Sequence, residues 1–236
     1  MRQFPPLAVV IPAAGVGSRM QADKAKQYLT IGHKTILQHT LECFVTLPFV
    51  EQIYVSVSES DQRFATLDIT RSDKVIRVKG GKERADSVLN GVTQAQQDGH
   101  QWVMVHDAAR PCVSTEDIES LYQTCLEQNE AGILASPVRD TMKRSQTQNQ
   151  TIATTIDRNG MWHALTPQCA KVEQLHLALR QKLQSDGLIS KAITDEASAL
   201  ELAGYPVHLV QGSVKNIKIT LPEDLELAEF YLSGKK

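Results

Sequence analysis

LAVVIPAAGVGSRMQADKAKQYL, residues 7–29, joins an apolar run to a loop that is rich in small and basic residues. A continuous apolar run of this length, with β-branched residues, is typical of a buried strand, and glycines after it are typical of a turn. In an open α/β sheet, such a turn lies beyond the carboxyl end of the strand, where ligands bind. The stretch therefore predicts a first buried strand with a ligand-binding loop at its end.

Five further runs resemble the first and alternate with segments of helical periodicity. These runs are QIYVSVS (52–58), KVIRVKG (74–80), WVMVHD (102–107), GILASPV (132–138) and PVHLVQ (206–211). Apolar side chains spaced as one helix face occur within residues 36–44, 88–95 and 118–125. Strands that alternate with helices predict an α/β fold with a doubly wound, mostly parallel sheet. We expect one domain that spans residues 1–236.

Residues 138–157 interrupt this alternation. Their two ends are strand-like, whereas the middle is rich in Gln, Asn and Thr. A protruding β-hairpin arm is the simplest interpretation. The arm is either a flexible excursion or a dimer contact, and the apolar side chains on its flanks favour the contact: Val138, Met142, Ile152 and Ile156.

The composition is that of an ordinary soluble globular protein. The 236 residues are 42% hydrophobic and 22% charged, with a formal net charge of -2. No global positive field is present to drive binding to nucleic acid or to an anionic membrane surface, and no run approaches the roughly 20 apolar residues of a membrane span. The four cysteines form no CxxC pair, which argues against a structural zinc site and a disulfide framework. We therefore expect a cytoplasmic protein without nucleic-acid or membrane partners.

The opening loop favours phosphate as its ligand, although it matches neither familiar phosphate motif. It lacks the G-x-x-x-x-G-K-[ST] pattern of a P-loop, and Met20 stands where the third glycine of G-x-G-x-x-G belongs. Arg19 and Lys26, with Lys24 nearby, have the charge to converge on a polyphosphate chain. The alternative is a solvated basic loop.

Three later segments also have both a functional and an ordinary interpretation. Asp107 ends an apolar run, where it either binds Mg²⁺ or caps a turn. The pair Gly80–Gly81 precedes a helix start, where it brings the backbone close to a flat ligand, with Ser87 at a base edge, or simply makes a turn. Lys218 lies in the strand-like run NIKIT and points either to solvent or into a site.

Taken in order, these segments resemble the 2-C-methyl-D-erythritol 4-phosphate cytidylyltransferase family. The resemblance runs from Val10 to about Tyr231 and therefore covers almost the whole chain. Seven ordered motifs carry it: PAAGVGSRM followed by KQY, GGKERADSV, VHDAARP, PVRDTMKR, DRNGMWHALTPQ, TDEASALE and NIKIT.

The resemblance implies a Rossmann-like nucleotidyltransferase that joins CTP and 2-C-methyl-D-erythritol 4-phosphate in the non-mevalonate isoprenoid pathway. The products would be 4-diphosphocytidyl-2-C-methyl-D-erythritol and pyrophosphate, with Mg²⁺ as cofactor. It also implies a homodimer that forms through the arm, with Arg158 acting across the interface.

The resemblance assigns roles to residues of this chain by motif. The catalytic residues would be Arg19, Lys26, Arg158 and Lys218. The CTP-binding residues would be Ala13, Ala14, Gly15, Arg19, Lys26, Gly81, Lys82, Ser87, Asp107 and Ala108, with Asp107 also holding Mg²⁺. The acceptor would be bound by Thr141, Arg158, Thr166, Thr194 and Lys218.

Two departures from the family pattern and two alternative functions remain. Ala25 stands where the family often has proline. Cys169–Ala170 follows TPQ, whereas the family commonly has an aromatic residue at the second position after TPQ. A cytidylyltransferase that acts on ribitol 5-phosphate would share the nucleotide half of the site. A catalytically silent nucleotide-binding protein would keep GGKERADSV but could lose the charged residues, all of which are present.

Overall fold

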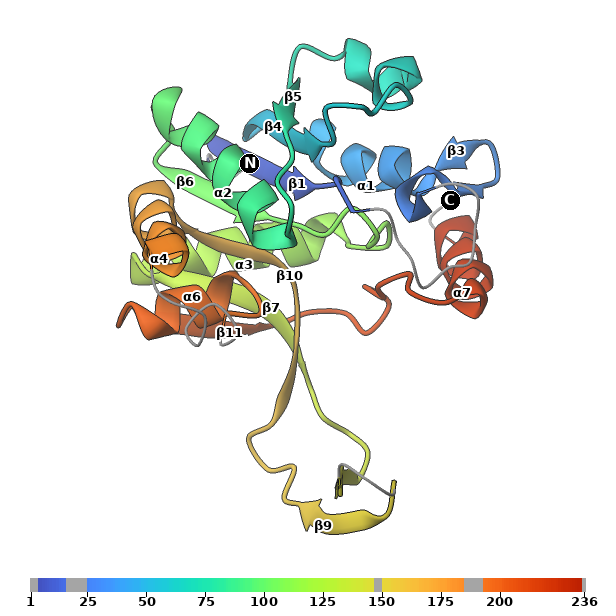
Figure 1. Ribbon diagram of the computed structural model, residues 1–236, viewed down its shortest axis with the longest axis vertical. Coiled ribbons are helices and arrows are strands. Elements are labelled where there is room, and N and C mark those ends of the chain that lie inside the picture. Colours follow the sequence, from blue (N-terminus) through green and yellow to red (C-terminus); the bar gives the residue numbers. More distant parts are fainter. Residues whose placement is uncertain (1–3, 16–24, 147–149, 185–192, 235–236) are drawn as a thin grey trace.

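A mostly parallel seven-stranded sheet forms the centre of the structure, a computed structural model that describes residues 4–15, 25–146, 150–184 and 193–234 (Figure 1). The strands lie in the order β11-β7-β10-β6-β1-β4-β5, and β10 runs antiparallel to both of its neighbours. Their bounds are β1 Leu7–Pro12, β4 Val50–Val57, β5 Val75–Lys79, β6 Trp102–Val105, β7 Ala131–Pro137, β10 Trp162–Lys171 and β11 Val207–Gln211. The predicted α/β fold is confirmed.

Helices cover both faces of this sheet. They are α1 Ile36–Val45, α2 Arg84–Gln97, α3 Thr115–Gln128, α4 Val172–Gln184, α6 Glu196–Leu202 and α7 Pro222–Ser233. Val9 and Ile11 of β1 belong to a core with α1 and α3, whereas Ala8 and Val10 pack with α2, α4 and α6. Successive side chains of a strand point to opposite faces of the sheet. Because helices cover both faces, the side chains on both sides of β1 are buried and apolar.

Short elements complete the fold around the sheet. The 3₁₀ helices are η2 Lys26–Tyr28, η3 Phe64–Thr66 and η4 Asp68–Arg71, and a small hairpin pairs β2 Thr30–Ile31 with β3 Lys34–Thr35. In the described part of the chain, no helix has the length and apolar character that a membrane span needs.

The parallel strands agree with the strands predicted from the sequence, whereas β10 was not predicted. All six predicted strands are present, and the three predicted apolar helix faces lie on α1, α2 and α3. The segment WHALTPQCAK was not predicted as a strand, because it contains polar residues and Pro167, which usually argues against a central strand. The register of β10 against β7 shifts between Ala164 and Gln168, and this irregularity accommodates the proline.

A hairpin lies within residues 138–157, here called the β-arm. Its strands are β8 Met142–Ser145 and β9 Ile152–Ile156, which pair antiparallel. Figure 1 shows the β-arm extending away from the sheet, as a continuation of β7 and β10. Ile152 of β9 is 64% exposed. The predicted arm is therefore present, and its role as a dimer contact stays a prediction.

Candidate functional site

A cavity of about 270 Å³ opens at the carboxyl ends of β1 and β6, beside the turn into α2. Doubly wound sheets bind their ligands at this edge. Most of the residues assigned from the motifs meet there. The lining comprises Pro12, Ala13, Ala14, Gly15, Lys26, Gln27, Gly81, Lys82, Glu83, Arg84, Ser87, Asp107, Ala108, Ala109 and Lys218.

The backbone that follows β1 is held in place from two sides. The amide of Ala13 donates to the carbonyl of Ser56 at 2.8 Å, and Nε2 of Gln27 donates to the carbonyl of Ala13 at 2.6 Å. Gln27 is buried and was not assigned a role from the sequence, although it follows Lys26 directly in the motif. These two bonds order the start of the loop before any ligand binds.

The turn into α2 is built by tight packing as well as by hydrogen bonds. The Ser87 hydroxyl accepts from the Gly81 amide at 3.0 Å and donates to the Glu83 carbonyl at 3.2 Å. A Cβ at Gly81 would lie 2.1 Å from Cβ of Asp86, and one at Gly80 would lie 2.3 Å from Cβ of Ala14. The glycines are therefore required by the turn itself, and base recognition by Ser87 stays a prediction.

Asp107 lies at the centre of an ion-pair network. Its carboxylate accepts from Nε of Arg84 at 3.0 Å, from Nζ of Lys218 at 2.9 Å and from Nε of Arg110 at 3.5 Å. The residue is only 7% exposed. Burial by itself would raise the pKa of Asp107, but the three neighbouring cations hold that pKa well below its usual range. The carboxylate is therefore charged at neutral pH.

Arg84 connects this network to α6. Its Nη1 and Nη2 atoms donate to the two carboxylate oxygens of Glu196 at 2.6 and 3.1 Å. Burial alone would lower the pKa of Arg84, yet the carboxylates of Glu196 and Asp107 raise it. Arg84 and Glu196 had no predicted role, because an ion pair between residues 112 positions apart leaves no local pattern in the sequence.

Positive charge exceeds negative charge in this network. Three cations face two carboxylates, and along the same cavity Lys26 and Lys82 add two positive charges and Glu83 adds one negative charge. A partly enclosed pocket with this balance attracts anions, and its low dielectric strengthens the attraction. The arrangement fits a ligand with several phosphate charges.

The backbone of Asp107 is positioned by a buried hydrogen-bond chain. Its amide donates to the hydroxyl of Thr166 at 3.1 Å, and that hydroxyl lies 3.0 Å from Nδ1 of His106. Nε2 of His106 lies 3.0 Å from the carbonyl of Arg110, which can only accept, so the proton is on Nε2 and Nδ1 accepts from Thr166. The hydroxyl of Thr166, assigned to the acceptor by resemblance, is thus already engaged with the protein.

The titration of His106 is expected to reduce stability as the pH falls. Burial lowers the pKa of His106 to about 4, whereas the unfolded chain has an ordinary value of about 6.5. Between about pH 6.5 and pH 4, His106 is protonated in the unfolded chain but still neutral in the folded protein, so lowering the pH favours the unfolded state. The free energy of unfolding should therefore fall by about 3 kcal/mol from pH 7 to pH 4. Urea unfolding of the wild type and of His106→Asn across this range measures the effect.

The asparagine variant keeps an acceptor near the position of Nδ1 but has no proton to take up. Its unfolding free energy should therefore lack this part of the pH dependence, while the exposed control His33→Asn should behave like the wild type. An unchanged acid slope in His106→Asn would contradict the assignment.

Lys218 reaches the cavity from a loop, not from a strand. The run NIKIT was expected to be strand-like, but residues 212–220 form no strand. The loop is fixed because the amide of Ile219 donates to the carbonyl of Ala109 at 2.9 Å and Nδ2 of Asn216 donates to the carbonyl of Thr166 at 2.7 Å. The alternation of apolar and polar residues in NIKIT reflects a buried Ile219 beside a partly exposed Lys218. The ion pair of Lys218 with Asp107 shows that the lysine points into the site.

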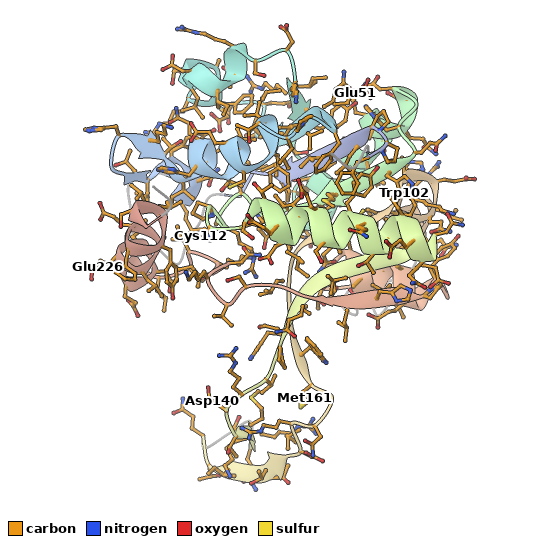
Figure 2. All side chains as sticks on the ribbon, turned by 180° about the vertical axis from the view of Figure 1, so that it is seen from behind. Glu51, Trp102, Cys112, Asp140, Met161 and Glu226 are labelled. Carbon is orange, nitrogen blue, oxygen red and sulfur yellow. The ribbon has the colours of Figure 1, made fainter. Side chains whose placement is uncertain are left out.

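Of the assigned residues that the structure describes, four do not line the cavity: Thr141, Arg158, Thr166 and Thr194. Thr194 lines a separate space of about 140 Å³ that shares Glu83 and Arg84 with the main cavity. Thr141 belongs to the β-arm and Arg158 directly follows it, and Figure 2 shows Asp140 and Met161, close to them in sequence, on the segment that extends away from the body of the molecule. Arg19 lies outside the described residues, as does Lys24.

Two carboxylates line the cavity, those of Asp107 and Glu83, and only Asp107 was assigned to a metal from the motifs. In the described ranges, no three His, Cys, Asp or Glu side chains are grouped so that they could hold a metal ion. A site that depends on a single carboxylate suits Mg²⁺, which is commonly bound by one or two carboxylates together with the phosphates of a substrate.

A doubly wound sheet with a cation-lined cavity at its carboxyl edge defines an α/β protein that binds a phosphorylated ligand. Comparison with known proteins agrees: the model of the family described as 2-C-methyl-D-erythritol 4-phosphate cytidylyltransferase matches residues 7–234. The chain belongs to this family.

Relatives with the same description cover nearly the full chain. The chain is 54% identical to the 2-C-methyl-D-erythritol 4-phosphate cytidylyltransferase of Vibrio vulnificus (strain CMCP6), over 100% of this chain and 98% of that protein. It is 52% identical to that of Aliivibrio fischeri (strain MJ11), with 98% and 95% covered. The crystal structure of the Francisella tularensis enzyme superposes with a TM-score of 0.80 at 37% identity, covering 96% and 99% of the two chains.

Proposed function

We propose that the protein transfers CMP from CTP to 2-C-methyl-D-erythritol 4-phosphate, in the isoprenoid pathway. The products are 4-diphosphocytidyl-2-C-methyl-D-erythritol and pyrophosphate. The cation-lined cavity, built from the family motifs at the carboxyl edge of the sheet, is the observation that carries the proposal. The family match favours this acceptor over ribitol 5-phosphate.

The reaction brings two anions together. A phosphate oxygen of the acceptor forms a bond to the α-phosphorus of CTP, while the bond from that phosphorus to the bridging oxygen breaks and pyrophosphate leaves. Such transfers depend on positioning and on neutralising charge more than on a general base. Lys26 and Lys218 line the cavity and supply positive charge where negative charge develops in the transition state.

Asp107 is the residue proposed to hold Mg²⁺, which neutralises phosphate charge when it is bound. The carboxylate is ionised and lines the cavity, as a ligand of this kind must. Its oxygens accept from three cations in the structure, of which Lys218 has the most exposed side chain, at 40%. Lys218 therefore has room to turn from Asp107 to a phosphate.

The acceptor half of the site is proposed to include the β-arm of a second copy in a homodimer. Thr141 lies in the β-arm and Arg158 directly after it. Because the arm extends away from the body of its own chain (Figure 2), these two residues would act in the site of a partner chain. The exposed side chains of Ile152 and Met161 supply apolar surface for this contact.

Complementation between inactive variants tests the shared site. Lys218→Met and Arg158→Ala should each show little activity alone. In a co-expressed mixture, each mixed dimer has one site with neither substitution, so random pairing should restore about a quarter of wild-type activity. Activity no higher than that of the separate variants would contradict a shared site.

The function is tested by pyrophosphate release in the presence of Mg²⁺. The assay compares 2-C-methyl-D-erythritol 4-phosphate with ribitol 5-phosphate as acceptor, and CTP with ATP, GTP and UTP as donor. Release with CTP and methylerythritol phosphate alone is the expected result. Release only with ribitol 5-phosphate would overturn the acceptor assignment, and no release with either would indicate a silent nucleotide-binding protein.

A further inference from the structure

Glu196 is a buried carboxylate to which the motifs assign no role. It begins α6 and is only 2% exposed. Both of its oxygens accept from the guanidinium of Arg84, whose third nitrogen donates to Asp107. A single arginine thus connects α6 with the carboxylate at the centre of the cavity.

The start of α6 is itself fixed to the sheet. Asp195 caps the helix by accepting from the amide of Ser198 at 3.0 Å. Gln168 of β10 donates to Asp195 at 2.9 Å and accepts from the amide of Ala197 at 2.8 Å. Glu196 lies between the two residues that Gln168 holds, so its position is set by the central strand.

We propose that Glu196 is a positioning residue of the cytidylyl transfer, which holds Arg84 as a fixed counter-ion of Asp107. The inference rests on the proposed function. Arg110 is similarly held, because its Nη1 donates to the carbonyl of Asn216 at 2.7 Å. With both arginines held from outside the cavity, Asp107 remains aligned when Lys218 turns toward an anion.

The geometry requires both the charge and the shape of Arg84. A guanidinium presents donors in a rigid planar fork, so it can bond two oxygens of Glu196 and one of Asp107 at once. A lysine in the same place is a point charge on a flexible stem. A glutamine in place of Glu196 keeps the volume and one acceptor but loses the charge.

The test compares Glu196→Gln, Arg84→Lys and the double variant, with Glu201→Gln as matched control. Glu201 is exposed on the same helix, so its substitution should change nothing. For Glu196→Gln we expect kcat per folded molecule to fall by about tenfold, because a small displacement of an aligned group slows transfer strongly. The KM for CTP should stay within about threefold, because the nucleotide walls are intact.

The double variant shows whether Glu196 acts through Arg84. If it does, the double variant should be about as active as Arg84→Lys alone, because the second substitution removes an interaction that is already lost. Circular dichroism and urea unfolding measure the folded fraction, so that kcat can be expressed per folded molecule. A purely structural role of Glu196 would lower stability and leave this kcat unchanged. If Glu196→Gln does not fold, Glu196→Asp takes its place in the same cycle.

Three results would overturn the inference. If the wild type is active and folded Glu196→Gln has the same kcat, the positioning role of Glu196 is contradicted and the proposed function is not. Losses that multiply in the double variant would show that Glu196 acts independently of Arg84. A wild type without transferase activity would overturn the proposed function and this inference together.

Discussion

Lys218→Met is expected to lower kcat by about two to three orders of magnitude while the fold stays intact. Nζ of Lys218 lies 2.9 Å from Asp107 at the cavity, and its side chain is the most exposed of the three cations there. Removing it takes away the charge that is best placed to meet an incoming phosphate. Methionine keeps most of the apolar stem, so packing of the loop should survive. Steady-state pyrophosphate release measures the loss.

Lys215→Met is the matched control for this substitution. Lys215 is exposed on the same loop, three residues earlier, and it does not line the cavity. Both variants lose one positive charge, so a general effect of net charge would appear in both. Equal activity of the two variants, at any level, would contradict a specific role for Lys218.

Asp107→Asn is expected to lower the free energy of unfolding by about 3 kcal/mol at pH 7 and to abolish most of the activity. The substitution leaves Arg84, Arg110 and Lys218 without the carboxylate that they share. Arg110 is buried and Arg84 is partly buried, so their mutual repulsion is only partly screened. Urea unfolding measures the stability, and pyrophosphate release measures the activity.

The effect of Asp107 on stability should depend on pH in a defined direction. The pKa of Asp107 is lowered in the folded state, since its burial is outweighed by the three cations, whereas the unfolded chain has a value of about 3.9. Its contribution is therefore fully present above about pH 4 and is lost as the pH falls further, through the folded pKa. The difference between wild type and Asp107→Asn should stay constant from about pH 7 to pH 5 and shrink below about pH 4.

The Asp107 carboxylate is one of the groups that raise the pKa of His106, so both proteins are compared in a His106→Asn background, where His106 does not titrate. A difference that grows toward acid pH would contradict the ion-pair assignment.

The sequence predicted features that arise from neighbouring residues. The apolar run of β1 indicated a strand covered on both faces, and the structure places helices there on each side. The glycine pair before α2 indicated a turn, and the space around Gly80 and Gly81 shows that no side chain fits. The hairpin of the β-arm was also visible, as two strand-like ends around a polar middle.

Other features depended on which distant segments the fold brings together. β10 lies in the centre of the sheet although its sequence contains Pro167 and buried polar residues, because Thr166 and Gln168 find hydrogen-bond partners in Asp107 and α6. NIKIT looks like a strand but is a loop. Its apolar side chains pack beside α7, and its backbone bonds to the loop after β6.

By itself, the sequence determined the fold class, the family and the edge of the sheet at which the cavity lies, because strand periodicity and motif order are local properties of the chain. The tertiary structure alone decided how the charges are paired. Arg84 with Glu196, and Lys218 with Asp107, join residues more than a hundred positions apart. Such pairs form because the sheet places the ends of distant segments at one edge, where a buried carboxylate must be compensated by cations.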